Sequence, residues 1–290
     1  MENHLLGKID KNMNTFSKGQ KLIAEYIQEN YDKAAFMTAA KLGYTVGVSE
    51  STVVRFATEL GYDGYPRLQQ AMQEMIKNRL TSVQRVEVAY SRIGNSDVLD
   101  TVMTQDANKI KRTLEETSKE DFYSAVEKII NAEKIYIVAA RSSYFLAEFL
   151  GFYLKLIFNN VKIINATVEM EVCEQLLNTN NRDVVIGISF PRYSKCAVKA
   201  IEFASEKGAN IISITDSKNS PMFNVSDCVL LARSDVISVV DSLTAPLSLI
   251  NSLIVAIALR KKEEVQDIFD RLEKIWDKYG VYEKIEEERE

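Results

Sequence analysis

The chain has 290 residues, of which 46% are hydrophobic and 27% charged, and its formal net charge is −5 at pH 7. This length allows one large domain or two ordinary ones, and the composition is typical of a soluble protein with substantial hydrophobic cores. No apolar stretch reaches the roughly 20 uncharged residues that cross a bilayer, and the N-terminus lacks a secretory signal pattern. We therefore expect a cytoplasmic protein that does not use a membrane.

The cysteines and the single histidine do not indicate a metal site or a disulfide framework. The three cysteines are widely spaced and odd in number, which predicts neither a disulfide framework nor a zinc site. The only histidine is His4, close to the N-terminus, so no histidine-based catalytic triad is expected. We assign no catalytic residue, no metal ligand and no cofactor.

Residues 1–79 are predicted to form an all-α domain. Helical periodicity starts near residue 16, Thr38 and Ser49 are placed to cap two further helices, and the periodicity resumes over residues 65–80. Residues 1–80 contain ten Lys and Arg and nine Asp and Glu, so this domain is not strongly basic. If it binds DNA, its basic side chains must gather on one face, and dimerisation would double the contacts.

Residues 80–97 are polar and indicate a linker that is partly helical, followed by a second domain over residues 98–290. Continuous Val/Ile runs alternate there with helical segments, which predicts a five-stranded parallel α/β sheet covered on both faces. Such doubly wound sheets bind ligands outside the carboxyl ends of their strands. A last amphipathic segment, residues 262–279, either packs on its own domain or forms a subunit interface. The expected strands are residues 134–140, 161–166, 183–189, 208–215 and 227–232.

Residues 38–62, TAAKLGYTVGVSESTVVRFATELGY, predict two short helices joined by a tight turn. Gly47 can adopt the left-handed conformation that ends the first helix, and Val48 is an apolar plug between the two helices. The second helix is expected to turn Val53, Val54 and Leu60 inward. The alternative is a helical hairpin that only packs. In a helix-turn-helix, the residues placed to meet the DNA major groove would be Ser49, Ser51, Thr52 and Arg55.

The stretch GVSESTVVRFATELGYDGYPRLQ resembles the N-terminal domain of the RpiR family of bacterial transcription regulators. The family signature runs G-V-S-x-x-T-V-x-R-F and then L-G-[FY]-x-G-[FY], and every position is matched. The resemblance implies that Ser49, Ser51, Thr52 and Arg55 contact DNA. An alternative role for Arg55 is a structural pair with Glu59, one helical turn further on. Weaker candidates for phosphate contacts are Lys18, Lys41 and Arg67.

Residues 120–232 resemble the sugar isomerase (SIS) domain that follows in RpiR proteins, a five-stranded parallel sheet that binds phosphosugars. In typical SIS domains the first strand ends in G-x-G-x-S and the third in S-x-S-G-x-T, and these hydroxyls and free amides hold the phosphate. Here residues 139–143 read AARSS and residues 189–194 read SFPRYS. The glycines are lost, the hydroxyls of Ser143, Ser189 and Ser194 survive, and Arg141 and Arg192 enter the two loops.

Arginine offers a planar fork that suits phosphate or carboxylate, so the two arginines can add charge to an anion site. Alternatively they block the pocket by pairing with acids such as Asp216, Glu148 or Asp241. In a third case the ligand is anionic but is not a phosphosugar. The predicted effector site comprises Arg141, Ser142, Ser143, Ser189, Arg192, Tyr193 and Ser194.

The sequence therefore predicts a DNA-binding transcription regulator, active in carbohydrate metabolism, that senses a phosphosugar or a related anionic metabolite. It is expected to bind a double-stranded operator as a homodimer or homotetramer, with the linker transmitting the signal. One alternative is a sugar-phosphate isomerase with an accessory DNA-binding domain. Another is a regulator whose SIS pocket has lost its ligand. An isomerase needs a positioned base, and the available acids are Glu169, Glu171 and Glu174.

Overall fold

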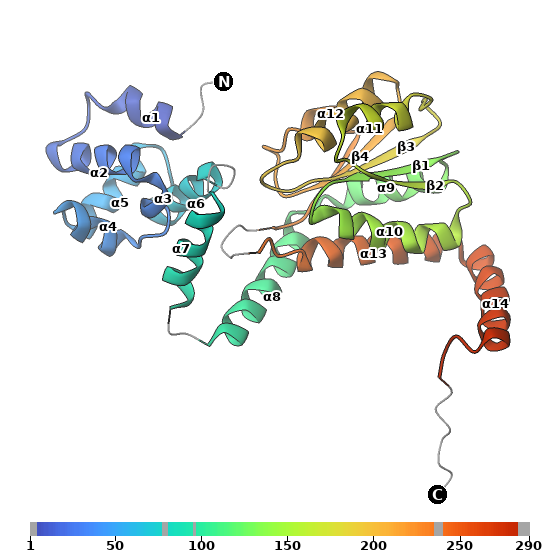
Figure 1. Ribbon diagram of the computed structural model, residues 1–290. Coiled ribbons are helices and arrows are strands. Elements are labelled where there is room, and N and C mark those ends of the chain that lie inside the picture. Colours follow the sequence, from blue (N-terminus) through green and yellow to red (C-terminus); the bar gives the residue numbers. More distant parts are fainter. Residues whose placement is uncertain (1–4, 77–80, 95–96, 235–239, 284–290) are drawn as a thin grey trace, which may run out of the picture. The chain divides into compact units, whose positions relative to one another are not determined.

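The computed structural model describes residues 5–76, 81–94, 97–234 and 240–283, so His4 lies outside the described chain. Contacts divide the chain between Val98 and Leu99 into a helical N-terminal unit and a C-terminal unit that contains a sheet (Figure 1). The segment expected as a linker holds a helix, α7 (Ser82–Ile93), which belongs to the N-terminal unit. Thr81 and Gln84 begin this helix with a capping box, which the polar sequence alone did not indicate.

The N-terminal unit is built from seven helices in the part of the chain that is described. Ser17 caps α2 and Thr38 caps α4, each accepting a hydrogen bond from a backbone N–H in the first turn. Before them lies α1, an eight-residue helix that the sequence did not predict. Helices α2, α4 and α5 begin where the caps and periodicity indicated, whereas the four-residue helix α3 was not predicted. Their bounds are α1 (Leu5–Asn12), α2 (Lys18–Glu29), α3 (Tyr31–Ala34), α4 (Ala39–Val46), α5 (Glu50–Glu59), α6 (Gly64–Ile76) and α7.

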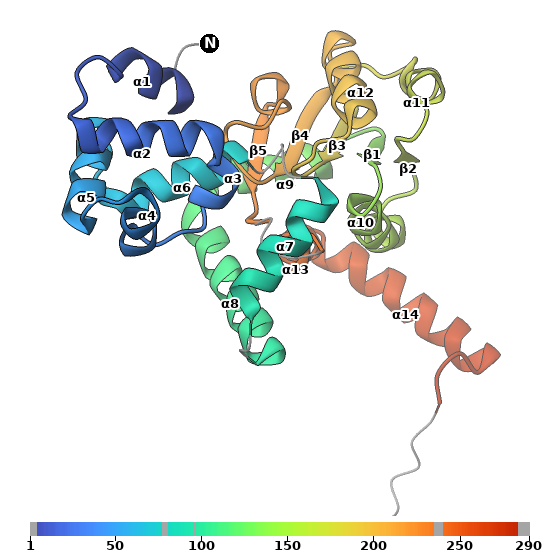
Figure 2. The same ribbon diagram turned by 60° about the vertical axis from the view of Figure 1, so that its left-hand side comes forward.

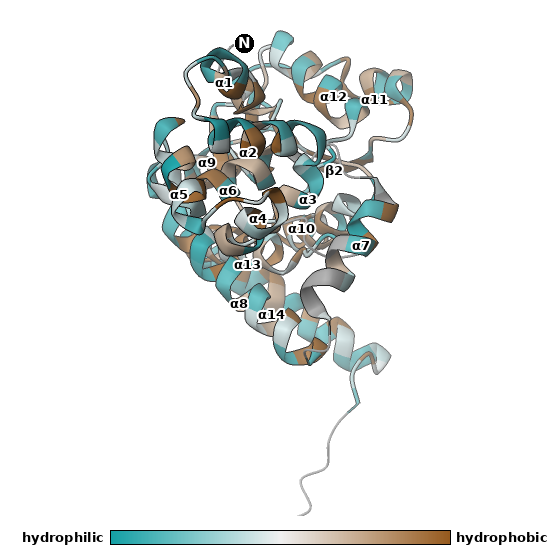
Figure 3. Ribbon diagram, turned by 90° about the vertical axis from the view of Figure 1, so that its left-hand side faces the viewer, coloured by the Kyte–Doolittle hydropathy of each residue, from teal (hydrophilic) through white to brown (hydrophobic). Residues whose placement is uncertain are grey.

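One hydrophobic core holds these helices together. Phe16 and Phe56 meet at its centre with their ring centroids 5.1 Å apart, and Ile23 and Leu42 are fully buried beside them. Hydrophilic and hydrophobic residues both occur along these helices (Figure 3), as expected of amphipathic helices whose apolar side faces a core. The unit therefore has a core of its own.

The C-terminal unit contains a five-stranded, all-parallel sheet in the order β2-β1-β3-β4-β5. Each predicted strand is present, shortened by one or two residues at its ends. All five residues of β1 and of β3 are buried, because helices cover both faces. The strands are β1 (Ile135–Ala139), β2 (Val161–Asn165), β3 (Val184–Ile188), β4 (Asn210–Thr215) and β5 (Cys228–Leu231).

Alternate residues of β1 supply the two cores. Ile135 and Ile137 face a core shared with α9, α10 and α13, whereas Tyr136 and Val138 face a core shared with α11 and α12. The two groups of helices lie on opposite sides of the sheet (Figures 1 and 2). The elements around the sheet are α8 (Val98–Glu116), α9 (Lys119–Ile130), α10 (Ser143–Ile157), α11 (Glu169–Leu176), α12 (Lys195–Glu206), the short 3₁₀ helix η1 (Phe223–Val225), α13 (Thr244–Arg260) and α14 (Lys262–Tyr279).

Helix α14 follows α13 after a bend of 100° and has no fully buried residue. Its predicted apolar stripe is present, but Phe269, Ile275 and Tyr279 of that stripe are exposed. Within the described residues no single helix is long and apolar enough to cross a membrane, and only the bent pair α13–α14 reaches that length and composition together.

Candidate DNA-binding and effector sites

The turn between α4 and α5 has the geometry of a helix-turn-helix. Gly47 ends α4 in the left-handed conformation, with φ 77°, and its N–H donates to the carbonyl of Gly43. Ser49 caps α5, since its Oγ accepts from the N–H of Thr52 at 3.3 Å. Gly43 is the residue that the sequence analysis missed: a Cβ there would lie 2.8 Å from the carbonyl oxygen of Val48. Only a glycine lets the two helices approach this closely.

The four candidate DNA contacts of α5 form one polar cluster. The Oγ of Ser49 lies 2.8 Å from the Oγ of Ser51 and 2.8 Å from the Oγ1 of Thr52. Arg55 is exposed, and its Nε donates to the carbonyl of Ser51 at 3.3 Å. Among the described residues Arg55 makes no ion pair, and Glu59 accepts instead from Gln20 at 3.4 Å. The structural pairing of Arg55 with Glu59 is therefore absent.

One inward-facing residue of α5 was assigned wrongly. Val54 is 39% exposed, whereas Val53 and Leu60 are buried as expected. The buried side of α5 consists of Val53, Phe56 and Leu60 at helical spacing, and Val54 lies about 100° around the helix from Val53. Val54 thus belongs to the exposed surface beside Arg55.

The weaker phosphate candidates are all exposed, but they lie on three other helices. Lys18 is adjacent to Gly19, whose Cα faces the side chains of Val48 and Thr52, so it lies close to the start of α5. Lys41 sits over the ring of Tyr44 at 5.7 Å, and Arg67 donates to Gln70 at 3.1 Å. Tyr44 is 83% exposed on α4, and sequence analysis did not single it out.

A cavity of about 410 Å³ opens at the carboxyl ends of β1 and β3. The two strands are neighbours in the sheet, and the chain runs from β1 outward to β2 and then returns to β3. This is the switch point where doubly wound sheets bind ligands. The loops after β1 and β3 line the cavity together with Asp241 and Leu243, and they contribute Ala140, Arg141, Ser142, Ser143, Ser189, Phe190, Pro191, Arg192 and Ser194.

Six of the seven predicted effector residues line this cavity. The Oγ of Ser189 accepts from the N–H of Ser194 at 3.3 Å, and the Oγ of Ser194 accepts from the N–H of Ala197 as the cap of α12. Each hydroxyl still has its own proton to donate to an anion. At α10, Ser142 makes no side-chain cap, the N–H groups of Tyr144 and Phe145 donate to the carbonyls of Arg141 and Ser142, and the buried Ser143 begins the helix beside the cavity. Two helix N-termini and three hydroxyls therefore converge on the cavity.

The two arginines keep their charges available. Both are exposed, and within the described residues neither forms an ion pair, so the pairing with Asp216, Glu148 or Asp241 is absent. Arg141 adopts φ 55°, the left-handed conformation that a typical SIS glycine would occupy without strain. For an arginine this conformation costs roughly 1–2 kcal/mol. Strained residues of this kind cluster at functional sites.

Tyr193 is the exception among the predicted effector residues. It does not line the cavity, and its hydroxyl donates to the Oδ1 of Asp216 at 2.6 Å. Burial and the neighbouring Asp216 carboxylate raise the pKa of Tyr193 above its ordinary value, in that order of importance. The phenol stays protonated and locks the loop after β3 onto the end of β4, a structural role.

The cavity wall that carries Asp241 is tied to α8. Asp106 of α8 accepts hydrogen bonds from the hydroxyls of Ser242, at 2.7 Å, and Thr244, at 2.9 Å. Its partner within the helix is Lys109, at 3.0 Å. Burial raises the pKa of Asp106, but the hydrogen bonds from Ser242, Lys109 and Thr244 outweigh burial, so the pKa lies below its ordinary value. The carboxylate is charged at neutral pH and links helix and loop.

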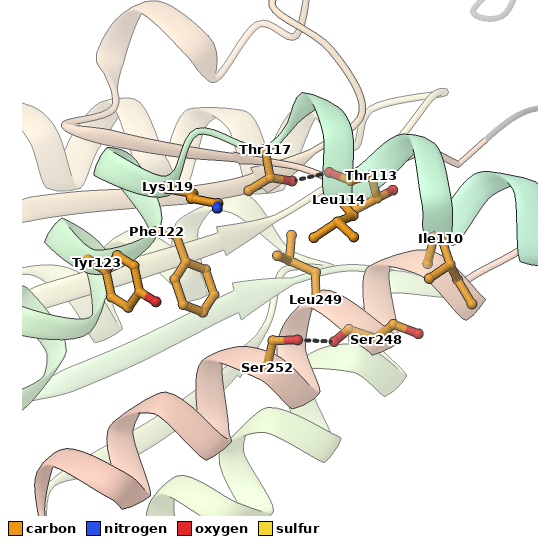
Figure 4. Close-up of a pocket in the computed structure, with 11 residues that line it drawn as sticks. Ile110, Thr113, Leu114, Thr117, Lys119, Phe122, Tyr123, Ser248, Leu249 and Ser252 are labelled. Carbon is orange, nitrogen blue, oxygen red and sulfur yellow. Dashed lines mark hydrogen bonds between the residues drawn. The ribbon is translucent and has the colours of Figure 1, made fainter.

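A second cavity, of about 300 Å³, is apolar and lies between α8, α9 and α13 (Figure 4). Leu114, Phe122 and Leu249 form its walls. The hydroxyls at its edge are engaged locally: Thr117 donates to the carbonyls of Thr113 and Leu231, and Ser252 donates to a carbonyl one turn earlier. Such walls favour an apolar occupant.

Comparison with known proteins agrees with both the helix-turn-helix of the N-terminal unit and the parallel sheet of the C-terminal unit. Residues 3–79 match the helix-turn-helix domain of the rpiR family, and residues 128–256 match the SIS domain. The chain belongs to the RpiR family. It is thus a helix-turn-helix transcriptional regulator with a SIS domain. An uncharacterized HTH-type transcriptional regulator of Clostridium perfringens is 23% identical over 220 residues, which cover 75% of this chain and 77% of the relative.

Two solved structures share the fold. The sugar isomerase domain of an RpiR transcription factor from Sphaerobacter thermophilus is 27% identical with a TM-score of 0.58, covering 61% of this chain and 98% of that one. The NanR protein of Vibrio vulnificus, solved in complex with ManNAc-6P, is 20% identical with a TM-score of 0.58. That match covers 95% of this chain and 98% of NanR, so the shared fold extends over nearly the whole chain.

Proposed function

We propose that this RpiR-family regulator binds an operator through α5 and that an anionic metabolite of the phosphosugar type, bound at the ends of β1 and β3, changes its operator affinity. One observation carries the proposal: the loops after β1 and β3 place three hydroxyls, two helix N-termini and two arginines around one cavity. A set of donors without a balancing ion pair is built for an anion.

The DNA-binding half rests on the exposed cluster at the start of α5. Ser49, Ser51 and Arg55 present donors and acceptors on the first two turns of a helix whose other side is buried. A recognition helix reads base edges and phosphates with residues in these positions. Selection from a randomised duplex library by the full-length chain would yield the operator. Failure to enrich any sequence at physiological salt would contradict the proposal.

The effector half rests on the donor set of the cavity, and the fold shared with NanR, whose solved complex contains ManNAc-6P, supports it. Thermal-shift titration with hexose 6-phosphates, the matching free hexoses and inorganic phosphate is the direct test. We expect stabilisation by the phosphosugars, and Ser189→Ala should weaken it. A matched control is Ser226→Ala, which removes a hydroxyl that bonds Ser213 and Met222 away from the cavity. Stabilisation by no phosphorylated sugar would favour a pocket without a ligand.

Sensing fits the cavity better than isomerisation does. Glu169, Glu171 and Glu174, the acids considered as bases, are all exposed on α11 and do not line the described cavity. Glu169 is also paired with Lys199 at 2.7 Å. A general base must lie within hydrogen-bond reach of the proton it removes. Incubating the protein with hexose phosphates and assaying for isomers tests this directly, and turnover would establish the enzyme alternative.

We also propose that the apolar cavity of Figure 4 belongs to a contact with a second copy of the chain. Along α8, Leu99, Met103, Ile110 and Leu114 are 71%, 63%, 38% and 74% exposed at the spacing of a helix-pairing seam. These exposed side chains of α8 lie next to the apolar cavity, and Leu114 is one of the residues that line it. In a two-fold symmetric dimer the same surface patch of each subunit contacts the other. Such a patch must therefore contain both protruding side chains and a cavity that accepts them.

The dimer contact is testable by analytical ultracentrifugation. Leu114→Glu should weaken self-association at least tenfold, because a charge would enter the apolar contact. Leu177→Glu is the matched control, since Leu177 is 55% exposed directly after α11, on the other side of the sheet. Equal association constants for the two variants would remove α8 from the interface.

A further inference from the structure

The effector cavity contains more positive charge than one phosphate requires. The hydroxyls of Ser143, Ser189 and Ser194, at the N-termini of α10 and α12, already supply donors for one phosphate. Arg141 and Arg192 come in addition, one from each loop. The positive charge of these two arginines exceeds what binding of a single phosphate requires.

In the described structure neither arginine forms an ion pair with an acid of the protein. Asp216 accepts from Tyr193, and Tyr144 hydrogen-bonds to Glu148, so both of these acids have other partners. Asp241 lines the cavity but pairs with neither arginine. Arg141 and Arg192 line one cavity of about 410 Å³, and an anion that lies near both would reduce the repulsion between their like charges.

The backbone conformation of Arg141 indicates that this residue serves ligand binding and not the stability of the fold. Its left-handed φ of 55° suits glycine, so the loop keeps a strained arginine where an unstrained residue would serve the fold. The carbonyl of Arg141 accepts from the N–H of Tyr144, but its side chain makes no ion pair or hydrogen bond among the described residues, so its guanidinium is available for a ligand.

We propose that the effector carries two separate anionic groups: a phosphate held by the serine hydroxyls and helix N-termini, and a second anionic group held by Arg141 and Arg192. This rests on the proposed sensing function and names its ligand class, a phosphosugar with an additional carboxylate or phosphate. Each guanidinium presents a planar pair of N–H donors that fits either group bidentately.

Isothermal titration of the full-length protein with three probes tests the assignment. Glucose 6-phosphate has one anionic group, 6-phosphogluconate adds a carboxylate, and fructose 1,6-bisphosphate adds a phosphate. We expect at least one of the two doubly anionic probes to bind ten times more tightly than glucose 6-phosphate or better, and the one preferred identifies the second group. Equal affinity for all three would overturn the inference and leave the proposed function standing. No binding of any probe would overturn both.

Substitutions then show whether the arginines cause the preference. Arg141→Gly and Arg192→Gln should each reduce the affinity ratio to less than threefold, and Arg141→Gly should do so while raising the melting temperature of the ligand-free protein. Arg182→Gln removes the same charge beside Glu133, before β3 rather than after it, and should keep the ratio unchanged. If the affinity ratio between the doubly anionic probe and glucose 6-phosphate stays unchanged in both Arg141→Gly and Arg192→Gln, the proposed role of the arginines is overturned.

Discussion

Replacing Gly43 by alanine tests whether the close contact of α4 with the turn sets the position of α5. The added Cβ would lie 2.8 Å from the carbonyl oxygen of Val48 and 3.3 Å from the N of Glu50. Both are backbone atoms of the turn and of the first residue of α5, so no side-chain rotation relieves the clash. Either the turn moves away from α4 or the fold loses stability.

The magnitude follows from two opposing terms. Alanine is better than glycine inside a helix by about 0.8–1 kcal/mol. Overpacking a tight contact costs typically 1–3 kcal/mol, and a backbone clash belongs at the upper end of that range. We therefore expect Gly43→Ala to lower the free energy of unfolding by about 2 kcal/mol net, which for a domain of this size lowers the melting temperature by roughly 10 °C.

Calorimetry of the full chain and a gel-shift titration on the selected operator are the measurements. Gly7→Ala provides the control, because a Cβ at Gly7 in α1 meets no atom within 4 Å. That variant should gain up to about 1 kcal/mol from helix propensity alone. Gly43→Ala should also lose operator affinity by tenfold or more, since α5 must shift. If Gly43→Ala melts no lower than Gly7→Ala and binds the operator normally, the reasoning about the turn is refuted.

Three further substitutions have defined outcomes. Arg55→Ala should weaken specific operator binding by roughly 5- to 150-fold with an unchanged melting temperature, since a base-reading arginine contributes about 1–3 kcal/mol of discrimination; an unchanged gel-shift titration would reject it as a contact. Arg141→Gly should raise the free energy of unfolding in urea by about 1 kcal/mol through relief of the left-handed strain, and a loss of stability would contradict that source of strain. Tyr193→Phe takes one hydrogen-bond donor from the buried Asp216 carboxylate and should cost about 1–3 kcal/mol in the same assay, whereas a neutral effect would show that the bond is dispensable.

The sequence predicted most of the fold because its signals are local. Thr38 and Ser49 cap helices where their hydroxyls can reach a free N–H, and that geometry depends on three or four consecutive residues. The continuous Val and Ile runs predicted β1 and β3 for a similar reason, since only strands covered on both faces tolerate them. Helix α1 was not predicted because its eight residues give only a weak periodic pattern.

The site was harder to predict because it depends on contacts between distant segments. The loops around Ser143 and Ser189 could be paired from topology, since their strands end at the same edge of the sheet. Nothing near Tyr193 in the sequence shows that its hydroxyl meets Asp216, 23 residues further along. Gly43 was overlooked for the same reason: its need for space arises from the backbone of the next helix.

The bond between Asp106 and the loop after β5 has a thermodynamic consequence. Ser242 and Thr244 flank Leu243, a residue of the cavity wall, and both donate to this one carboxylate on α8. Helix α8 starts at Val98, where the N-terminal unit ends. If the proposed ligand displaces the wall, these hydrogen bonds would pass the displacement to the helix that leads to the helix-turn-helix unit. Because such coupling is reciprocal, a chain on its operator would have an effector threshold different from that of a free chain, by the same factor as the ligand alters DNA affinity.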